Sequence, residues 1–305
     1  MVDMKLVILI FSLLSIFAHA DDSKRLKFKQ VITGIPETAL RTGKAAISKD
    51  AILPWAAITG STFFLWANDQ NYIEDVQRWG RDLHIGNSEN TKTVFSVGPY
   101  PLLRLPSDTG SALYFLGDGW THFSIAGGFL LSGYMYDDHD RAWNTGLQIV
   151  HGMIVSTLAN QALKRSTGRE SPSKATEPRG KWRPFPSTPA YNKTTPMYDA
   201  FPSGHVMTAS LVFTVIAENF PEYKWYPIGI GTVWCSLLAL QMMNNGVHWA
   251  SDYPLGLAMG LTIGHFASKL GKPDTADDKK SSWRPMFFPS VAMDGTETIN
   301  ALFTY

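Results

Sequence analysis

A histidine follows Pro202, Ser203 and Gly204 at the start of an apolar run that is typical of a helix. Proline fits the first turn of a helix because its missing N–H group would have no partner there. Ser203 and Gly204 leave a hydroxyl and backbone N–H groups facing outward, and such a helix start binds anions. His205 would then place a titratable proton donor beside the anion. An ordinary helix cap explains the same residues, so this segment alone does not establish a site.

A second histidine, His248, stands four residues before Asp252. Residues at this spacing share one face of a helix. A carboxylate one turn away can hold one imidazole N–H and leave the other nitrogen free as a nucleophile or base. Binding of a metal by this pair, or capping of the next helix by Asp252, are alternative interpretations.

A lysine, Lys164, ends another apolar segment and precedes the turn Arg-Ser-Thr-Gly-Arg. Positive charge is favourable at the carbonyl end of a helix, so a helix cap explains Lys164 as well as an anion site does. Whether the three clusters form one site depends on the helices that position them.

The chain contains recurring apolar segments with polar or turn residues between them, and no run of strict two-residue alternation. We therefore predict an all-α fold, a bundle of about six helices. The segments lie near residues 51–68, 120–136, 145–163, 205–219, 226–243 and 253–270.

The order of these helices predicts that the three clusters meet. Lys164 and Pro202 lie at the two ends of a long loop, 165–200, rich in proline, serine, threonine and basic residues. Loops of this length inside a domain are usually functional. Two further helices return the chain to the same end of the bundle before His248. A cation, a helix N-terminus and two histidines at one place describe a phosphate site with a nucleophile and an acid.

These motifs resemble those of the type 2 phosphatidic acid phosphatases (PAP2), a family that includes bacterial acid phosphatases and lipid phosphatases and shares its core with vanadium haloperoxidases. The family pattern is Lys-x6-Arg-Pro, then Pro-Ser-Gly-His, then Ser-Arg-x5-His-x3-Asp, and the resemblance covers residues 120–270. It implies His248 as the nucleophile that forms a phosphohistidine, Asp252 as its orienting carboxylate and His205 as the acid for the leaving oxygen. Lys164, Ser203 and the Gly204 amide would hold the phosphate, and neither a metal nor another cofactor is implied.

The sequence departs from this pattern at both phosphate-binding arginines. Ser171 and Met242 stand at those positions, so both bidentate guanidinium clamps are missing. Arg169 and Arg183 are the nearest candidates to replace them. Three functions therefore stay open: a metal-independent phosphatase for a phosphomonoester or lipid-linked phosphate, a degenerate phosphate-ester-binding protein without activity, and a vanadate-dependent oxidant enzyme.

The first twenty residues have the layout of a secretory signal peptide, with an uncleaved anchor as the alternative. We expect residues 21–110 to form an N-terminal segment with one apolar helix, 111–272 the catalytic bundle and 273–305 a tail. A helix needs roughly 20 apolar residues to cross a bilayer, and the predicted helices have that length or are shorter. A membrane-spanning bundle and a soluble bundle are therefore both possible interpretations. We expect a bacterial-type cell envelope location, at the inner membrane or in the periplasm.

Composition excludes some functions. The 27 Lys and Arg residues against 26 Asp and Glu leave a net charge of +1, without the basic stripe that nucleic acid requires. The single cysteine, Cys235, cannot form an intramolecular disulfide and fits a core position.

The cluster Asp137-Asp138-His139-Asp140 could bind a divalent metal, although a solvated loop explains it better. Three further histidines on apolar segments are expected to be satisfied core or lining residues: His122, His151 and His265.

Overall fold

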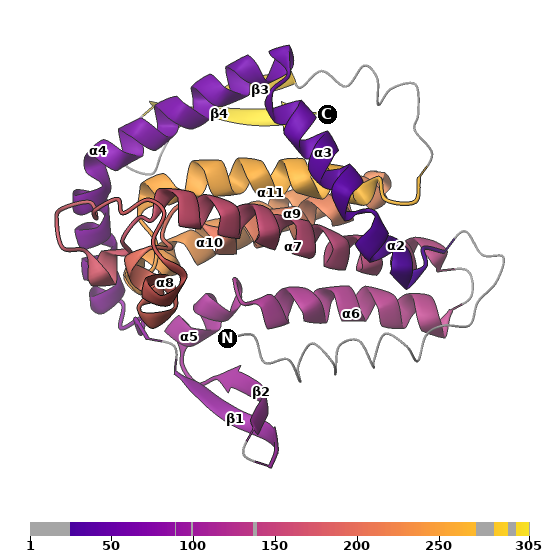
Figure 1. The fold of residues 1–305 in the computed structure, drawn as a ribbon, viewed down its shortest axis with the longest axis horizontal. Helices are drawn as coiled ribbons and strands as arrows, with labels where there is room; N and C mark the ends of the chain where they lie inside the picture. Colours follow the sequence, from indigo (N-terminus) through magenta and orange to yellow (C-terminus); the bar gives the residue numbers. More distant parts are fainter. Residues whose placement is uncertain are drawn as a thin grey trace.

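The computed structural model describes residues 25–88, 90–98, 100–136, 139–272, 284–291 and 297–304, so the predicted signal peptide lies outside the described residues. Each of the six apolar segments lies within a helix, apart from one or two residues at some ends, which confirms the all-α fold class. These helices are α4 (Ile52–Asp82), α6 (Gly119–Met135), α7 (Asp140–Thr167), α9 (Gly204–Asn219), α10 (Trp225–Asn244) and α11 (Tyr253–Ser268). Five helices, α6, α7, α9, α10 and α11, form a bundle whose long axes run in similar directions, and α4 runs obliquely to them (Figure 1).

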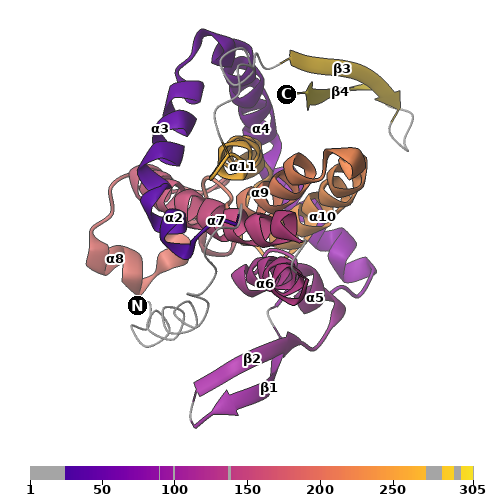
Figure 2. The same ribbon diagram turned by 90° about the vertical axis from the view of Figure 1, so that its right-hand side faces the viewer.

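Helix α9 is the centre of the bundle and packs against α7, α10 and α11 (Figure 2). Its buried Leu211 and Val215 join Ile149 of α7 and Ile263 of α11 in one apolar core. Helix α11 approaches α9 closely because Gly260 has no side chain; a Cβ atom there would collide with the backbone and a hydroxyl of α9. This core fixes the start of α9, where Pro-Ser-Gly-His lies.

The N-terminal segment has more structure than the single helix predicted for it. Helices α2 (Phe28–Thr33) and α3 (Ile35–Ala46) precede α4, and α4 itself continues to Asp82. A hairpin of β1 (Thr91–Val97) and β2 (Tyr100–Pro106) follows. The strand sequence TKTVFSV is rich in residues that favour strands. Register shifts on both sides of Phe95 interrupt the pairing, and they account for the lack of a clean two-residue alternation.

The remaining elements are short. They are the turns η1 (Lys49–Ala51), η2 (Pro172–Lys174), η3 (Thr195–Met197), η4 (Pro221–Tyr223) and η5 (Ala250–Asp252), the helices α5 (Thr109–Phe115) and α8 (Thr188–Lys193), and the C-terminal strands β3 (Arg284–Val291) and β4 (Glu297–Thr304), which pair antiparallel. The loop that carries α8 lies at one end of the bundle, beside the C-terminal part of α4 (Figure 1). Helix α7 ends and α9 begins at this end, as the sequence predicts.

Candidate active site

His248 and His205 face one another at this end of the bundle. The Nε2 atom of His248 lies 3.2 Å from Nδ1 of His205, and the two rings are nearly perpendicular at 73°. His248 follows α10 in a loop, and His205 lies in the first turn of α9. The structure thus brings together two histidines that are 43 residues apart in sequence.

The tautomer of His248 follows from its other ring nitrogen. Nδ1 lies 2.7 Å from the carbonyl oxygen of Ala200. A carbonyl oxygen can only accept, so Nδ1 carries the proton and Nε2 keeps its lone pair. Burial, together with the nearby Lys164 cation, lowers the pKa of His248 to about 3. The imidazole is therefore neutral at pH 7, as a nucleophile must be.

Asp252 takes a different place from the one its spacing predicts. Its Oδ2 atom lies 3.5 Å from Nδ1 of His248 but accepts a 2.7 Å hydrogen bond from the Trp249 backbone N–H. The segment between the two residues contains the 3₁₀ turn η5 rather than a continuous α-helix, so the i,i+4 geometry of an α-helix does not apply. The Ala200 carbonyl is the closer partner of His248, and Asp252 mainly holds the loop around it.

A buried ion-pair network lies behind Asp252. The guanidinium of Arg169 donates to Asp252 Oδ1 at 2.5 Å and to Asp69 Oδ2 at 2.7 Å, and all three side chains are fully buried. Asp69 also accepts from the backbone N–H and the hydroxyl of Ser251. Burial raises the pKa of Asp252 to about 6, although Arg169 opposes the shift. Asp69 has its pKa raised by burial as well.

The start of α9 and the end of α7 supply the groups that could hold an anion. Ser203 is the N-cap residue, and its hydroxyl accepts from the Val206 N–H at 3.4 Å. Lys164 is buried, with Nζ 3.4 Å from Asp199 Oδ2. Its charge helps to lower the pKa of both histidines, so the cation lies close to them. A helix N-terminus, one cation and a neutral imidazole with a free lone pair therefore share this site.

Residues 145–275 match the family model of the PAP2 superfamily. The resemblance to PAP2 proteins is confirmed. A solved structure, that of the first transmembrane PAP2 type phosphatidylglycerolphosphate phosphatase from Bacillus subtilis, is similar with a TM-score of 0.44 and 16% sequence identity, over 84% of this chain and 97% of that chain. No curated protein matches the chain. The PAP2 match supports a phosphatase-type function at the level of the family.

The two positions where PAP2 proteins carry arginines are buried here. Ser171 is 2% exposed, and Met242 packs fully buried against Ala209 and Leu238. Neither side chain carries a positive charge that could replace a guanidinium clamp. The two residues that differ from the PAP2 pattern are thus part of the packed interior around the site.

The two arginines predicted as replacements both point to carboxylates, which corrects that expectation. Arg169 uses both of its terminal nitrogens within the network described above. Arg183 donates from Nε and Nη2 to Glu170 Oε1 at 2.9 and 2.7 Å. Glu170 is buried and also accepts from backbone N–H groups of the loop, so Arg183 holds the loop together. Lys164 lies close enough to the histidine pair to lower the pKa of both residues.

Two polar side chains near the PAP2 motifs were not selected from the sequence as site residues. His122 is fully buried, and neither of its ring nitrogens has a hydrogen-bond partner of normal geometry among the described residues. His122 is among the groups that lower the pKa of His205, so it lies near the histidine pair. Its burial fits the expected core or lining position, but its ring nitrogens lack the partners that a satisfied residue would have. Asn160 is buried with an unpartnered Oδ1 atom. By contrast, His151 is satisfied by the Val31 carbonyl and Thr38, and His265 by Glu218.

The cluster at residues 137–140 falls partly outside the described residues, namely at Asp137 and Asp138. Of its other members, His139 contacts Ser132 and Asp140 pairs with Arg25 at 2.5 Å. Among the described residues, no group of three or more His, Cys, Asp or Glu side chains could hold a metal ion.

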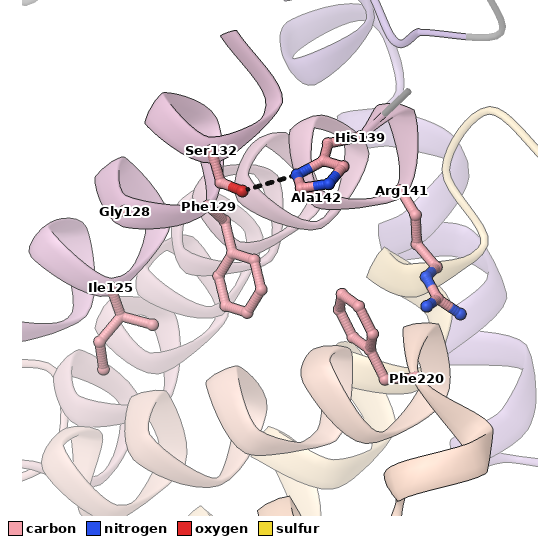
Figure 3. A pocket seen from close by; sticks show the side chains of 8 residues that line it. All are labelled: Ile125, Gly128, Phe129, Ser132, His139, Arg141, Ala142 and Phe220. Carbon is pink, nitrogen blue, oxygen red and sulfur yellow. Dashed lines mark hydrogen bonds between the residues drawn. The ribbon is translucent and has the colours of Figure 1, made fainter. Parts of the chain in front are cut away.

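A separate pocket of about 530 Å³ lies between α6, the start of α7 and the end of α9 (Figure 3). Phe129 and Phe220 line it, and the Arg141 guanidinium lies over the Phe220 ring and pairs with Glu222. The histidine pair lies where α7 ends and α9 begins, so this pocket is at the opposite end of the bundle. Its polar groups have partners of their own, and it is not part of the site around the histidine pair.

Proposed function

We propose that this chain is a PAP2-type phosphatase that hydrolyses a phosphomonoester or a lipid-linked phosphate through a phosphohistidine on His248. The observation that carries the proposal is the geometry of the His248 ring. Its Nδ1 atom lies 2.7 Å from the Ala200 carbonyl, which leaves the lone pair on Nε2, and Nε2 lies 3.2 Å from His205. An activated nucleophile, an acid and an anion-binding helix start are the parts that such a reaction needs.

The reaction divides into two displacements at phosphorus. His248 Nε2 forms a bond to phosphorus while the bond to the leaving oxygen breaks, and His205 donates a proton to that oxygen. Burial and the neighbouring charges lower the pKa of His205. The negative charge of a bound phosphate raises that pKa again, so His205 becomes protonated when the substrate is bound. Water then attacks the phosphohistidine, gives its proton to His205 and releases phosphate and neutral His248.

Lys164, Ser203 and the backbone N–H groups of Gly204 and His205 would bind the phosphoryl oxygens. Phosphoryl transfer depends on positioning and charge stabilisation, and one buried lysine shared with Asp199 provides less charge than a site with two additional arginines. We therefore expect a slow enzyme, and no metal is required for any step.

The pairing of Arg169 and Arg183 with carboxylates favours a second candidate function, a non-catalytic protein that binds phosphate esters. The deciding experiment is a phosphatase assay on the purified chain with soluble and lipid phosphoesters in excess chelator. Turnover that persists in chelator supports the enzyme. The binding protein is supported if the natural chain is inactive and the double substitution Ser171→Arg, Met242→Arg creates activity.

A membrane-associated location in a bacterial-type envelope, at the inner membrane or in the periplasm, completes the proposal. Within the described residues, α10 is long and apolar enough to cross a bilayer. Its outer surface exposes large apolar side chains, which suits contact with lipid: Trp225, Tyr226, Ile230, Val233, Leu237 and Leu240.

A further inference from the structure

Asn160 of α7 is a buried polar residue whose side chain forms no hydrogen bond within the described part of the chain. It is 6% exposed, and its Oδ1 atom is buried without a partner. Buried amides normally have partners because a buried group without one is destabilising by roughly 1 to 3 kcal/mol. An exception of this kind calls for an explanation in terms of a ligand or water.

The side-chain amide of Asn160 lies against the start of α9. Its Nδ2 atom is 2.5 Å from the position that a Cβ atom of Gly204 would occupy, so only glycine leaves room for the amide there. Lys164 lies one turn further along α7, and residues four apart share a helix face. Asn160 and Lys164 thus face the same N-terminus of α9, and His205 lies in its first turn.

We propose that Asn160 is a phosphate-binding residue of this site, in which its side-chain amide donates a hydrogen bond to a phosphoryl oxygen of the substrate. This inference rests on the proposed function and concerns the same site. A phosphate held by Lys164 and the first-turn N–H groups of α9 brings an acceptor oxygen to the amide. Oδ1 then accepts from a water or from a protonated phosphate oxygen.

A neutral amide fits a site that has lost both guanidinium clamps. It supplies a directional hydrogen bond without adding charge, whereas an arginine would supply two charge-assisted bonds. Asn160 therefore helps to orient the phosphate but does not neutralise its charge. Its role is distinct from that of the Arg169 network, which holds the His248 loop and has no free donor at its terminal nitrogens.

The test is the affinity of the full chain for inorganic phosphate and orthovanadate, measured by titration calorimetry, because binding does not require turnover. We expect Asn160→Ala to weaken both ligands by about tenfold, since each 1.4 kcal/mol is tenfold in affinity. Asn160→Asp, which has the same shape, should weaken them further by charge repulsion. The control is Gln161→Ala, at the next position on α7, whose side chain contacts Tyr191 instead and which should bind as the natural chain does.

Thermal melting of each variant shows whether it folds, and Asn160→Asp carries the test if the alanine variant does not. Unchanged affinity in folded Asn160 variants, or a natural chain that binds neither ligand, overturns the inference. These outcomes differ from failure of the proposed function, in which the natural chain binds phosphate but hydrolyses no phosphoester.

Discussion

The Nδ1 atom of His248 lies 2.7 Å from the backbone carbonyl oxygen of Ala200 and 3.5 Å from the Asp252 carboxylate. In a catalytic triad, the carboxylate holds the tautomer of the histidine. Here a backbone group does so, and it stays in place when a side chain is changed. The carboxylate instead links the loop to Arg169.

Substitution of Asp252 should therefore affect stability more than mechanism. We expect Asp252→Asn to lower the free energy of unfolding by about 3 kcal/mol, because it removes one partner of a buried ion pair. The turnover number should fall by about tenfold, far less than the roughly 10⁴-fold loss when a tautomer-fixing carboxylate is replaced. Chemical denaturation and steady-state kinetics measure the two effects. A 10⁴-fold loss in a variant of unchanged stability would mean that Asp252 holds the tautomer after all.

The two arginines should behave differently from one another. Arg169→Met leaves Asp69 and Asp252 buried without their cation, and we expect it to be destabilising by at least about 3 kcal/mol. Arg183 is 34% exposed at its side chain, and Glu170 keeps its backbone donors in its absence, so Arg183→Ala should cost about 1 kcal/mol or less. It should also change kcat/KM by less than about tenfold. A larger kinetic effect at Arg183, in a stably folded variant, would place its guanidinium in the phosphate site.

The pH dependence of stability should report the buried histidines. Burial lowers the pKa of His122 from 6.5 to about 4, so below pH 6.5 the unfolded chain binds a proton that the folded chain refuses. Stability from this group is present above pH 6.5 and is lost as the pH falls towards 4. His122→Phe removes this titration and two unpartnered nitrogen atoms.

We expect His122→Phe to raise the free energy of unfolding by about 1 kcal/mol at pH 7 and by more at pH 5. The matched variant His151→Phe loses hydrogen bonds to Val31 and Thr38 and should be destabilising at pH 7. Denaturation of both variants at the two pH values is the measurement. If His122→Phe is less stable than the natural chain at both, the ring of His122 has partners in solution.

The helices and the meeting of the two histidines could be predicted from the sequence, because apolar segments separated by turns specify a bundle and its connections. The Ala200 carbonyl could not be predicted, since a backbone group has no signature in residue type. Asp69 lies 100 residues before Arg169, just past the apolar segment 51–68. Only the packing of α4 against the His248 loop brings it to Arg169. The spacing of Arg169 makes it a plausible phosphate ligand. The sequence alone does not show that two carboxylates bind it instead.

The central claim is that His248 is the nucleophile. The most direct measurement is rapid acid-free quenching of the purified chain with a ³²P-labelled phosphoester in excess EDTA, followed by protein analysis. We predict label on the protein that survives alkali and is lost in acid, as a phosphohistidine is, with the label mapped to His248. It should be missing from folded His248→Ala and present in the control His265→Ala, whose histidine contacts Glu218 away from the site. Hydrolysis at the natural rate in His248→Ala, or label on another residue, would contradict the account.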